Sequence, residues 1–239
     1  MLRYDAVGVL LWRNMACGIL WRNMACGILT GAVVCGLLPL LLLCLSCGKS
    51  RVEGCVMPDS IKSQCCVGDI VLRKGTGMTS HVVCAAADSE DYSHCGIIAL
   101  GEDGKLVVVH AVPDEPDFDG DPDRVKVEPL ESFYSTIKST KGCLLRLVDS
   151  ADTSLTSCAA RVAMAVYRRR TLFDHDYDDS DTTRMYCSQL VDYAYLHAGV
   201  SLVGDKRHNF CVPGFNVQHV ILPSDFIHSP HIKTVAIFK

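Results

Sequence analysis

The residue of this sequence best suited to act as a nucleophile is Cys187. It stands in the first turn of a predicted helix over residues 184–199, because apolar residues recur at helical spacing from it and Gly199 supplies a stop signal. The free N–H groups and the positive dipole end of a helix N-terminus favour a thiolate over a thiol. The competing interpretation is a buried structural cysteine, since free cysteine is among the most buried residue types.

Two histidines upstream provide the remaining groups that thiol catalysis needs. Residues 91–100 and 105–111 are apolar, β-rich runs separated by a segment of turn composition, so they are predicted to pair as an antiparallel hairpin. His94 and His110 then lie on neighbouring strands, near a partly open cleft. A cysteine protease needs a base for the thiol proton and a third polar group that orients the base. Cys187, His94 and His110 can supply these three roles.

Five segments around these residues form a set that extends over most of the chain: GDIVLR (68–73), YSHCGI (92–97), HA (110–111), YCSQLV (186–191) and LPSD (222–225). The set resembles the YiiX-like branch of the NlpC-type cell-wall hydrolases, a circularly permuted papain-like family. The resemblance implies an α+β fold, with a small antiparallel sheet packed on helices and the nucleophile at a helix N-terminus. It also implies that Cys187 is the nucleophile, His94 the base, and His110 the group that completes the triad.

The sequence departs from this family at two positions. His110 stands where these hydrolases often carry Glu, and Gln189 stands where many members carry Glu. A His–His–Cys set also occurs in the related lecithin retinol acyltransferase group. From the resemblance as a whole, we predict hydrolysis of an amide through an acyl-enzyme, with cell-wall peptides or peptidoglycan fragments as substrates. A lipid or thioester acyl hydrolase or acyltransferase of the same fold, and a non-catalytic envelope binding module, are the alternatives.

Residues next to the proposed triad are predicted to bind the substrate, namely Tyr92, Ser93, Tyr186 and Ser188. The backbone N–H of Cys187 is the first expected oxyanion donor, and the sequence does not identify a second. The acidic run over residues 173–181 is predicted to be a polar segment that leads into the helix, with Asp181 or a following threonine as its cap. The alternative, which the resemblance implies, is that this run lines the substrate cleft.

The first 46 residues are predicted to be a leader. Residues 12–20 are repeated identically as residues 21–29, and no charged residue occurs from Met24 to Cys47, which is typical of a signal peptide. The run ends in a small residue followed by Cys47, a pattern that resembles a bacterial lipoprotein processing site. We therefore predict lipidation at Cys47, a membrane partner through this anchor, and an exported protein of the cell envelope.

Other interpretations of the leader remain open. The uncharged run is long enough to cross a bilayer, so an uncleaved anchor is an alternative, as is simple secretion. Met1, Met15 and Met24 are each candidate starts, and a nine-residue unit present only twice is too short for a solenoid. Residues 47–239 have the length of one domain with a single core.

Composition argues against several other function classes. The chain has 23 basic and 27 acidic residues, and its basic run at residues 168–170 is expected to end a helix over residues 153–170, so no nucleic acid partner is predicted. No HxxxH pair is present, and in the acidic segment 114–123 a proline replaces the glycine that a calcium loop requires. We predict no metal and no cofactor.

The cysteines do not read as a disulfide framework. Of the 14 cysteines, four lie in the leader, and the others are not regularly spaced. Most are therefore predicted to be core thiols. Near the C-terminus, residues 220–222 and 232–238 are predicted to be closing strands.

Overall fold

The computed structural model describes residues 54–86, 91–148, 153–212 and 215–239. The predicted leader and the predicted lipidation site at Cys47 lie outside these residues. The helices are α2 (Asp59–Lys62), α3 (Met78–Ala86), α4 (Leu130–Phe133), α5 (Thr153–Arg168), α6 (Cys187–His197) and α7 (Pro223–Ile227). The strands are β1 (Ile70–Gly75), β2 (His94–Leu100), β3 (Leu106–Val112), β4 (Arg124–Pro129), β5 (Ser139–Leu147), β6 (Leu172–Phe173), β7 (Arg184–Met185), β8 (His208–Val212), β9 (Phe215–Val220) and β10 (Ile232–Phe238).

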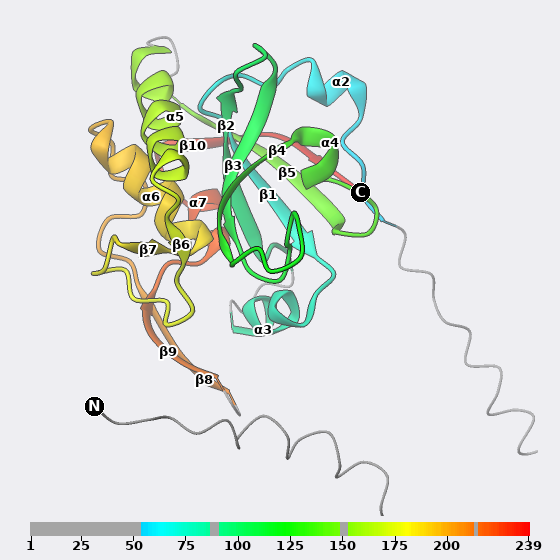
Figure 1. Cartoon of the computed structure of the whole chain (residues 1–239). Helices are drawn as coiled ribbons and strands as arrows, with labels where there is room; N and C mark the ends of the chain where they lie inside the picture. Colours follow the sequence, from blue (N-terminus) through cyan, green and yellow to red (C-terminus); the bar gives the residue numbers. More distant parts are fainter. Residues whose placement is uncertain (1–53, 87–90, 149–152, 213–214) are drawn as a thin grey trace, which may run out of the picture. The chain divides into compact units, whose positions relative to one another are not determined.

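Within the described part of the chain, eight strands form one sheet in the order β10-β5-β1-β2-β3-β4-β6-β7. Its strand pairs are antiparallel except for β6 with β7 at the edge, which makes the sheet mixed. Helices α5 and α6 lie side by side against the sheet, and α4 lies on its other side (Figure 1). The predicted α+β class is confirmed, and the sheet is larger than the small antiparallel sheet that we expected.

The two faces of the sheet bury different side chains. Cys95, Ile97 and Ala99 of β2 alternate toward the helices α5 and α6, whereas Ile98 packs with Phe133 and Tyr134 on the other side. Because successive side chains of a strand point to opposite faces, this alternation fixes the register of β2. His94 therefore belongs to the face of Ile98, while its neighbour Cys95 faces the helices.

The predicted hairpin of β2 and β3 is confirmed. Its turn is closed by the backbone N–H of Gly101, which donates to the carbonyl of Lys105, and Gly104 adopts φ +76°. Gly96 permits a second close approach, since a Cβ there would lie 2.8 Å from the carbonyl oxygen of Val109 and 3.0 Å from Cβ of His110. A larger residue at position 96 would thus push β3 away from β2 at the point where the two histidines meet.

The GDIVLR segment anchors the start of β1. Asp69 accepts two hydrogen bonds of 2.7 Å from Arg146 of β5 and one of 2.7 Å from the backbone of Cys66. Gly68 adopts φ +88°, and a Cβ there would lie 2.5 Å from the backbone of Thr156, so only glycine fits. This segment then delivers Arg73, the partner of His94 in the β1–β2 register.

The helix that carries Cys187 is shorter than predicted. It begins at Cys187 and ends at His197, and Arg184–Met185 instead form β7, which pairs with β6. The predicted cap at Asp181 or the threonines is wrong, because Tyr186 is the N-cap and Gln189 accepts a 3.2 Å hydrogen bond from its backbone N–H. Cys187 therefore lies in the first turn of the helix, as expected, and is its first residue.

Three other predictions are corrected in detail. The long amphipathic helix ends at Arg168 instead of Arg170, which adopts φ +58°. The strand predicted over residues 220–222 ends at Val220 and pairs with β8 in a separate hairpin, whereas β10 joins the main sheet as expected. Leu222 precedes α7, where Asp225 accepts a 2.8 Å hydrogen bond from its backbone N–H.

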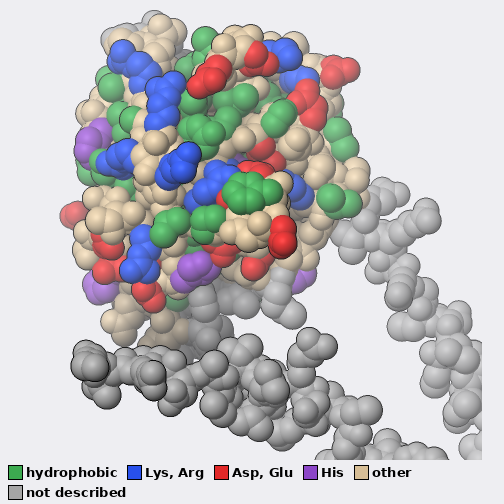
Figure 2. Space-filling view, in the orientation of Figure 1, with side chains coloured by type: hydrophobic (Ala, Val, Ile, Leu, Met, Phe, Trp, Pro, Cys, Tyr) green, Lys and Arg blue, Asp and Glu red, His purple; other side chains and the backbone are tan. Residues whose placement is uncertain are grey.

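Among the described cysteines with placed side chains, Cys55, Cys65, Cys95 and Cys143 are buried free thiols. This agrees with the prediction of core thiols, Cys66 being an exposed exception. None of the helices in the described segments is both long and apolar enough to cross a membrane. Lys and Arg side chains are interspersed with Asp and Glu side chains on the face shown in Figure 2.

Candidate active site

The two histidines predicted from the sequence are in direct contact. His94 Nε2 lies 2.8 Å from His110 Nδ1, and the two rings meet edge to face with centroids 5.1 Å apart. Both side chains are buried, His94 at 7% and His110 at 0% exposure. This contact occupies one nitrogen of His94, so Nδ1 is the nitrogen left to face Cys187.

Cys187 lies at the first position of α6, half-buried, with three polar side chains around its sulfur. His94 and Cys95 interact with it, and Ser188 Oγ lies 3.8 Å from Sγ. The N–H groups of the first helical turn have no acceptor within the helix, so they also point a positive potential at this end. The structure thus brings Cys187, His94 and His110 together in the predicted order.

These contacts set the protonation of the thiol. The interaction with Cys95, against the opposing effect of burial, and the contacts with His94 and Ser188 hold the pKa of Cys187 well below its ordinary value of 9.0. Burial and the charge of Arg73 lower the pKa of His94 from 6.5 to about 3. The lowered pKa of Cys187 favours release of the thiol proton, whereas the lowered pKa of His94 disfavours its uptake by the imidazole.

We take the lowered pKa of Cys187 as the governing direction. The contacts of its sulfur with Cys95 and Ser188, together with the dipole of α6, act whether or not His94 is charged. A thiolate at Cys187 in turn raises the pKa of His94, and a protonated His94 lowers that of Cys187. The pair therefore favours transfer of the thiol proton to His94.

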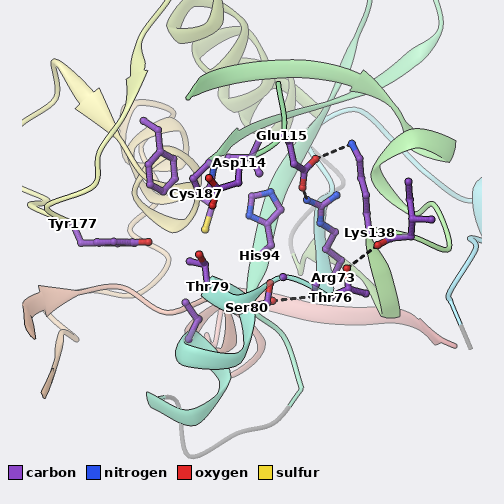
Figure 3. Close-up of a pocket in the computed structure, with 18 residues that line it drawn as sticks. Arg73, Thr76, Thr79, Ser80, His94, Asp114, Glu115, Lys138, Tyr177 and Cys187 are labelled. Carbon is purple, nitrogen blue, oxygen red and sulfur yellow. Dashed lines mark hydrogen bonds and ion pairs between the residues drawn. The ribbon is translucent and has the colours of Figure 1, made fainter. Parts of the chain in front are cut away.

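Cys187 and His94 open into a pocket of about 310 Å³ (Figure 3). Tyr177 points its hydroxyl toward Cys187 from one side, and Arg73 lies on the far side of His94. Hydroxyl side chains line the wall below, and the exposed Asp114 stands above Cys187. The remaining wall is formed by the turn after β1, by α3, and by the end of β3 with the residues that follow it, including Thr76, Thr79, Ser80, Val83, Val112, Pro113 and Glu115.

The residues predicted to bind substrate are placed differently from one another. Ser93 lines the pocket, where its Oγ accepts a 3.0 Å hydrogen bond from the backbone of Gly75. Tyr92, Tyr186 and Ser188 are buried and do not line it. Ser188 instead contacts the thiols of Cys95 and Cys187, and the hydroxyl of Tyr186 accepts a 3.1 Å hydrogen bond from the backbone of Ile221.

The acidic run before α6 is held to the helix by the side chain of Gln189. Its Nε2 donates to the carbonyl oxygens of Asp178, at 3.4 Å, and Asp181, at 2.8 Å. An amide can donate these bonds and a carboxylate cannot. Gln189 is therefore suited to holding this segment, and with it Tyr177, at the mouth of the pocket.

The surroundings of His110 differ from those that we expected. We predicted a site near a partly open cleft, but its side chain is fully buried and lies edge-on to the ring of Phe133, with centroids 5.3 Å apart. Its Nε2 lies 3.1 Å from Oε1 of Glu128 on β4. Removing His110 would therefore leave a cavity and a buried carboxylate, and would also cost stability.

Sequence reasoning missed three residues of this site. Glu128 gave no signal, because only the β3–β4 register brings it near His110. Tyr177 lies in the acidic run, with φ +56°, and its sequence context did not set it apart. Cys95 could have been found, since it follows His94 directly on a strand and must point to the opposite face, where a helix was expected.

Comparison with known proteins agrees with this geometry. The family described as permuted papain-like amidase enzymes of the YaeF/YiiX type matches residues 64–236. The chain belongs to this family, and it is a cysteine peptidase or amidase, that is, a thiol hydrolase. No curated protein sequence is similar enough to the chain to count as a match.

A solved structure shows the same fold. It is titled as the metalloprotein yiiX from Escherichia coli O157:H7, with a TM-score of 0.57 and 21% sequence identity, and the match covers 71% of this chain and 96% of that chain. Among the described residues of the present chain, no group of three or more His, Cys, Asp or Glu side chains is arranged to hold a metal ion.

Proposed function

We propose that this protein hydrolyses amide bonds in peptides, with cell-wall peptides as the substrate class, through Cys187, His94 and His110. The observation that carries the proposal is the linear arrangement of the three side chains. His94 interacts with Cys187 at the start of α6, and His94 Nε2 lies 2.8 Å from His110 Nδ1 on the next strand. This is the relation of nucleophile, base and orienting group that acyl transfer requires.

In the proposed reaction, the Cys187 sulfur attacks the carbonyl carbon of the amide while its proton passes to His94 Nδ1. His94 then gives this proton to the leaving amine as the C–N bond breaks, which leaves an acyl-enzyme. Water, deprotonated by His94, hydrolyses the thioester and returns the thiol. His110 holds the His94 ring and its Nε2 proton in place throughout.

The oxyanion of each tetrahedral intermediate needs hydrogen-bond donors near Cys187. The backbone N–H of Cys187 at the N-terminus of α6 is the first donor. The hydroxyl of Tyr177, which points toward Cys187 across the pocket, is the second in this proposal (Figure 3). Desolvation by burial raises the pKa of Tyr177, and the charge of Cys187 raises it further, so the hydroxyl keeps its proton.

The walls of the pocket favour a peptide over a long acyl chain. Thr76, Thr79, Ser80 and Ser93 provide hydroxyl groups that can bond to amide groups, and Asp114 provides a carboxylate for a positively charged amine. An alkyl chain would leave such polar groups without partners. The exported, lipid-anchored location predicted from the leader and Cys47 would place this activity at the cell envelope.

The test is incubation of the protein with peptidoglycan fragments and, separately, with short acyl esters. Release of new amino groups from the peptides by the wild type, and none by Cys187→Ala, is the expected result. Turnover of the esters without turnover of any peptide would replace the substrate class with acyl lipids or thioesters. If Cys187→Ala releases as many amino groups as the wild type, Cys187 is not the nucleophile.

A further inference from the structure

The side of the histidine pair that faces away from the pocket contains a carboxylate for which the triad has no role. Across β1, β2, β3 and β4, a row of buried polar side chains follows the strand order, namely Arg73, His94, His110 and, on β4, Lys126 and Glu128. Phe133 of α4 covers this row, and the Arg73 guanidinium lies 4.6 Å from the centroid of its ring. Water is thus excluded from the far side of His110.

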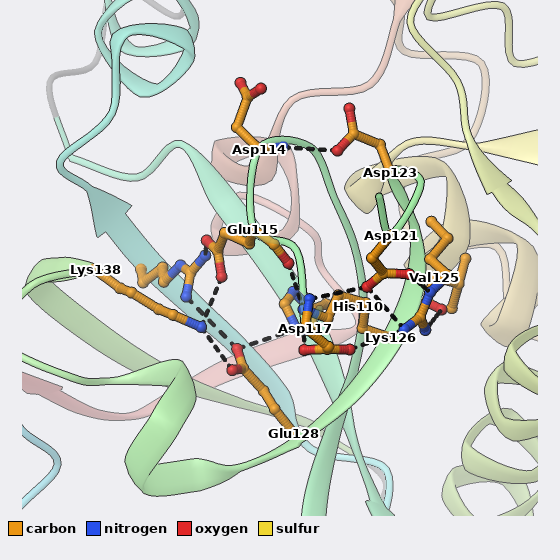
Figure 4. A network of polar contacts seen from close by, with 12 residues as sticks. His110, Asp114, Glu115, Asp117, Asp121, Asp123, Val125, Lys126, Glu128 and Lys138 are labelled. Carbon is orange, nitrogen blue, oxygen red and sulfur yellow. Dashed lines mark hydrogen bonds and ion pairs between the residues drawn. The ribbon is translucent and has the colours of Figure 1, made fainter. Parts of the chain in front are cut away.

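Glu128 is the partner of His110 in this row. His110 Nε2 lies 3.1 Å from Glu128 Oε1, and neither atom has another hydrogen-bond partner in the described part of the chain. The contact is within ion-pair distance, although the N–H is not aligned for a full hydrogen bond. The other oxygen of Glu128 accepts a 2.8 Å hydrogen bond from Lys138, which holds the carboxylate against His110 (Figure 4).

We propose that Glu128 is a positioning residue of the active site, which acts through His110 to fix the tautomer of His94 and to stabilise its protonated form. The inference rests on the proposed function of Cys187 and His94. It extends the triad into a row of four groups in which the carboxylate stands one strand further from the nucleophile.

The direction of the hydrogen bonds follows from the chemistry of His94. To accept a proton from Cys187, its Nδ1 must be free of hydrogen, so Nε2 carries the proton and donates to His110 Nδ1. His110 then carries its own proton on Nε2, which lies 3.1 Å from Glu128 Oε1. A carboxylate at this point selects one tautomer for both rings, since it can only accept.

The charge of Glu128 also balances its surroundings. Arg73, Lys126 and Lys138 contribute three positive charges around the two histidines, and Glu115, Asp117 and Glu128 contribute three negative charges that contact them. Loss of the Glu128 charge would leave a net positive charge behind His94 and disfavour its imidazolium. The same loss would therefore reduce the thiolate at Cys187.

The arrangement accounts for the departure at position 110. The family that the sequence resembles is expected to carry Glu where this chain has His110. In this chain the imidazole of His110 fills that position, and Glu128 supplies the carboxylate behind it at 3.1 Å. A carboxylate at both positions would place two like charges together in a buried site, which is costly.

The first experiment compares Glu128→Gln with Glu131→Gln, a matched control whose carboxylate is exposed and pairs with Lys62. The measurement is the rate of Cys187 alkylation by iodoacetamide over a pH range, which needs no substrate. Glu128→Gln should lower the rate at neutral pH by about tenfold or more and move the profile to higher pH, a smaller effect than loss of a carboxylate that contacts the base itself. Glu131→Gln should leave the profile unchanged.

The second experiment separates positioning from a merely structural role, because Glu128→Gln can also loosen the fold. In a His110→Glu background the sign should reverse: adding Glu128→Gln removes a repulsion and should raise the alkylation rate by about tenfold. The same or no change in both backgrounds would overturn the proposal. His94→Ala tests the proposed function separately from the role of Glu128. An unchanged alkylation profile in that variant would refute the proposed function itself.

Discussion

Two histidine–carboxylate–lysine groups in this molecule have the same composition but different surroundings. His110 lies 3.1 Å from Glu128, which contacts Lys138 at 2.8 Å, and His208 lies 2.9 Å from Asp225, which contacts Lys206 at 2.7 Å. The second nitrogen of His110 faces His94 and, beyond it, the thiol of Cys187. In the other group, the carboxylate of Asp225 has a structural role, because it holds separate segments of the chain together.

Asp225 joins three parts of the chain. It accepts hydrogen bonds from His208 of β8 and from the backbone of Leu222 at the start of α7, and it pairs with Lys206 in the preceding loop. The comparison shows that a histidine–carboxylate pair is not in itself a sign of catalysis. Its role depends on what the far nitrogen of the histidine contacts.

The largest expected difference between the two groups is in turnover. His94→Ala removes the base and should lower kcat/KM by about 10⁴-fold or more, close to the level of Cys187→Ala, because groups of a triad act as a unit. His208→Ala should change kcat/KM by less than about twofold, since no reacting group contacts it. A large loss of turnover in folded His208→Ala would end the distinction between the two groups.

A second difference concerns the pocket that is lined by Cys187 and His94. Tyr177→Phe removes one proposed oxyanion donor and should lower kcat by about 10²-fold, with KM nearly unchanged, as for other single donors of this kind. The alkylation profile of Cys187 should shift only slightly, because an alkylation reaction forms no oxyanion. If KM rises while kcat is kept, Tyr177 contributes to substrate binding instead.

A third prediction concerns the protonation of the Cys187 thiol. Since the interaction with Cys95 is the largest of the causes that lower the pKa of Cys187, Cys95→Ala should raise that pKa and lower the rate of Cys187 alkylation at neutral pH by up to about tenfold. The midpoint of the alkylation profile should therefore move to higher pH. A matched variant, Cys143→Ala, removes a buried thiol that belongs to β5 and should leave the midpoint in place.

The smallest expected effect is on stability at the second group. Asp225→Asn should lower the free energy of unfolding by about 1–3 kcal/mol and leave turnover intact, because a buried carboxylate loses its charged partners. Against the effect of burial, contacts with Lys206, Leu222 and His208 lower the pKa of Asp225 below 3.8. The folded state thus binds fewer protons at this group, so its contribution is present above about pH 4 and is lost as pH falls further.

Melting temperatures measured from pH 7 down to pH 3 check this prediction. The difference between wild type and Asp225→Asn should shrink as the pH falls below about 4, when the carboxylate takes up a proton in both the folded and the unfolded chain. Unchanged melting together with lost activity would assign Asp225 to the reaction.

The sequence by itself determined the class of fold and the location of the chemistry. A helix stripe that starts at Cys187 and a β-hairpin that carries His94 and His110 are local patterns, because periodicity and turn composition depend on neighbouring residues alone. The five resembling segments added the permuted papain-like fold, and the family match agrees with it. The contact of 2.8 Å between the two histidines then follows from the hairpin register and from the small size of Gly96.

What the tertiary structure alone decided is the environment of these groups. Burial of His110, the approach of Glu128 from β4, and the covering ring of Phe133 depend on how β3, β4 and α4 pack, which no local pattern of the sequence encodes. The same holds for Tyr186 and Ser188, whose positions beside Cys187 suggested substrate contacts but whose side chains point into the core. Periodicity predicts which face a side chain shares, and only packing decides whether that face is open.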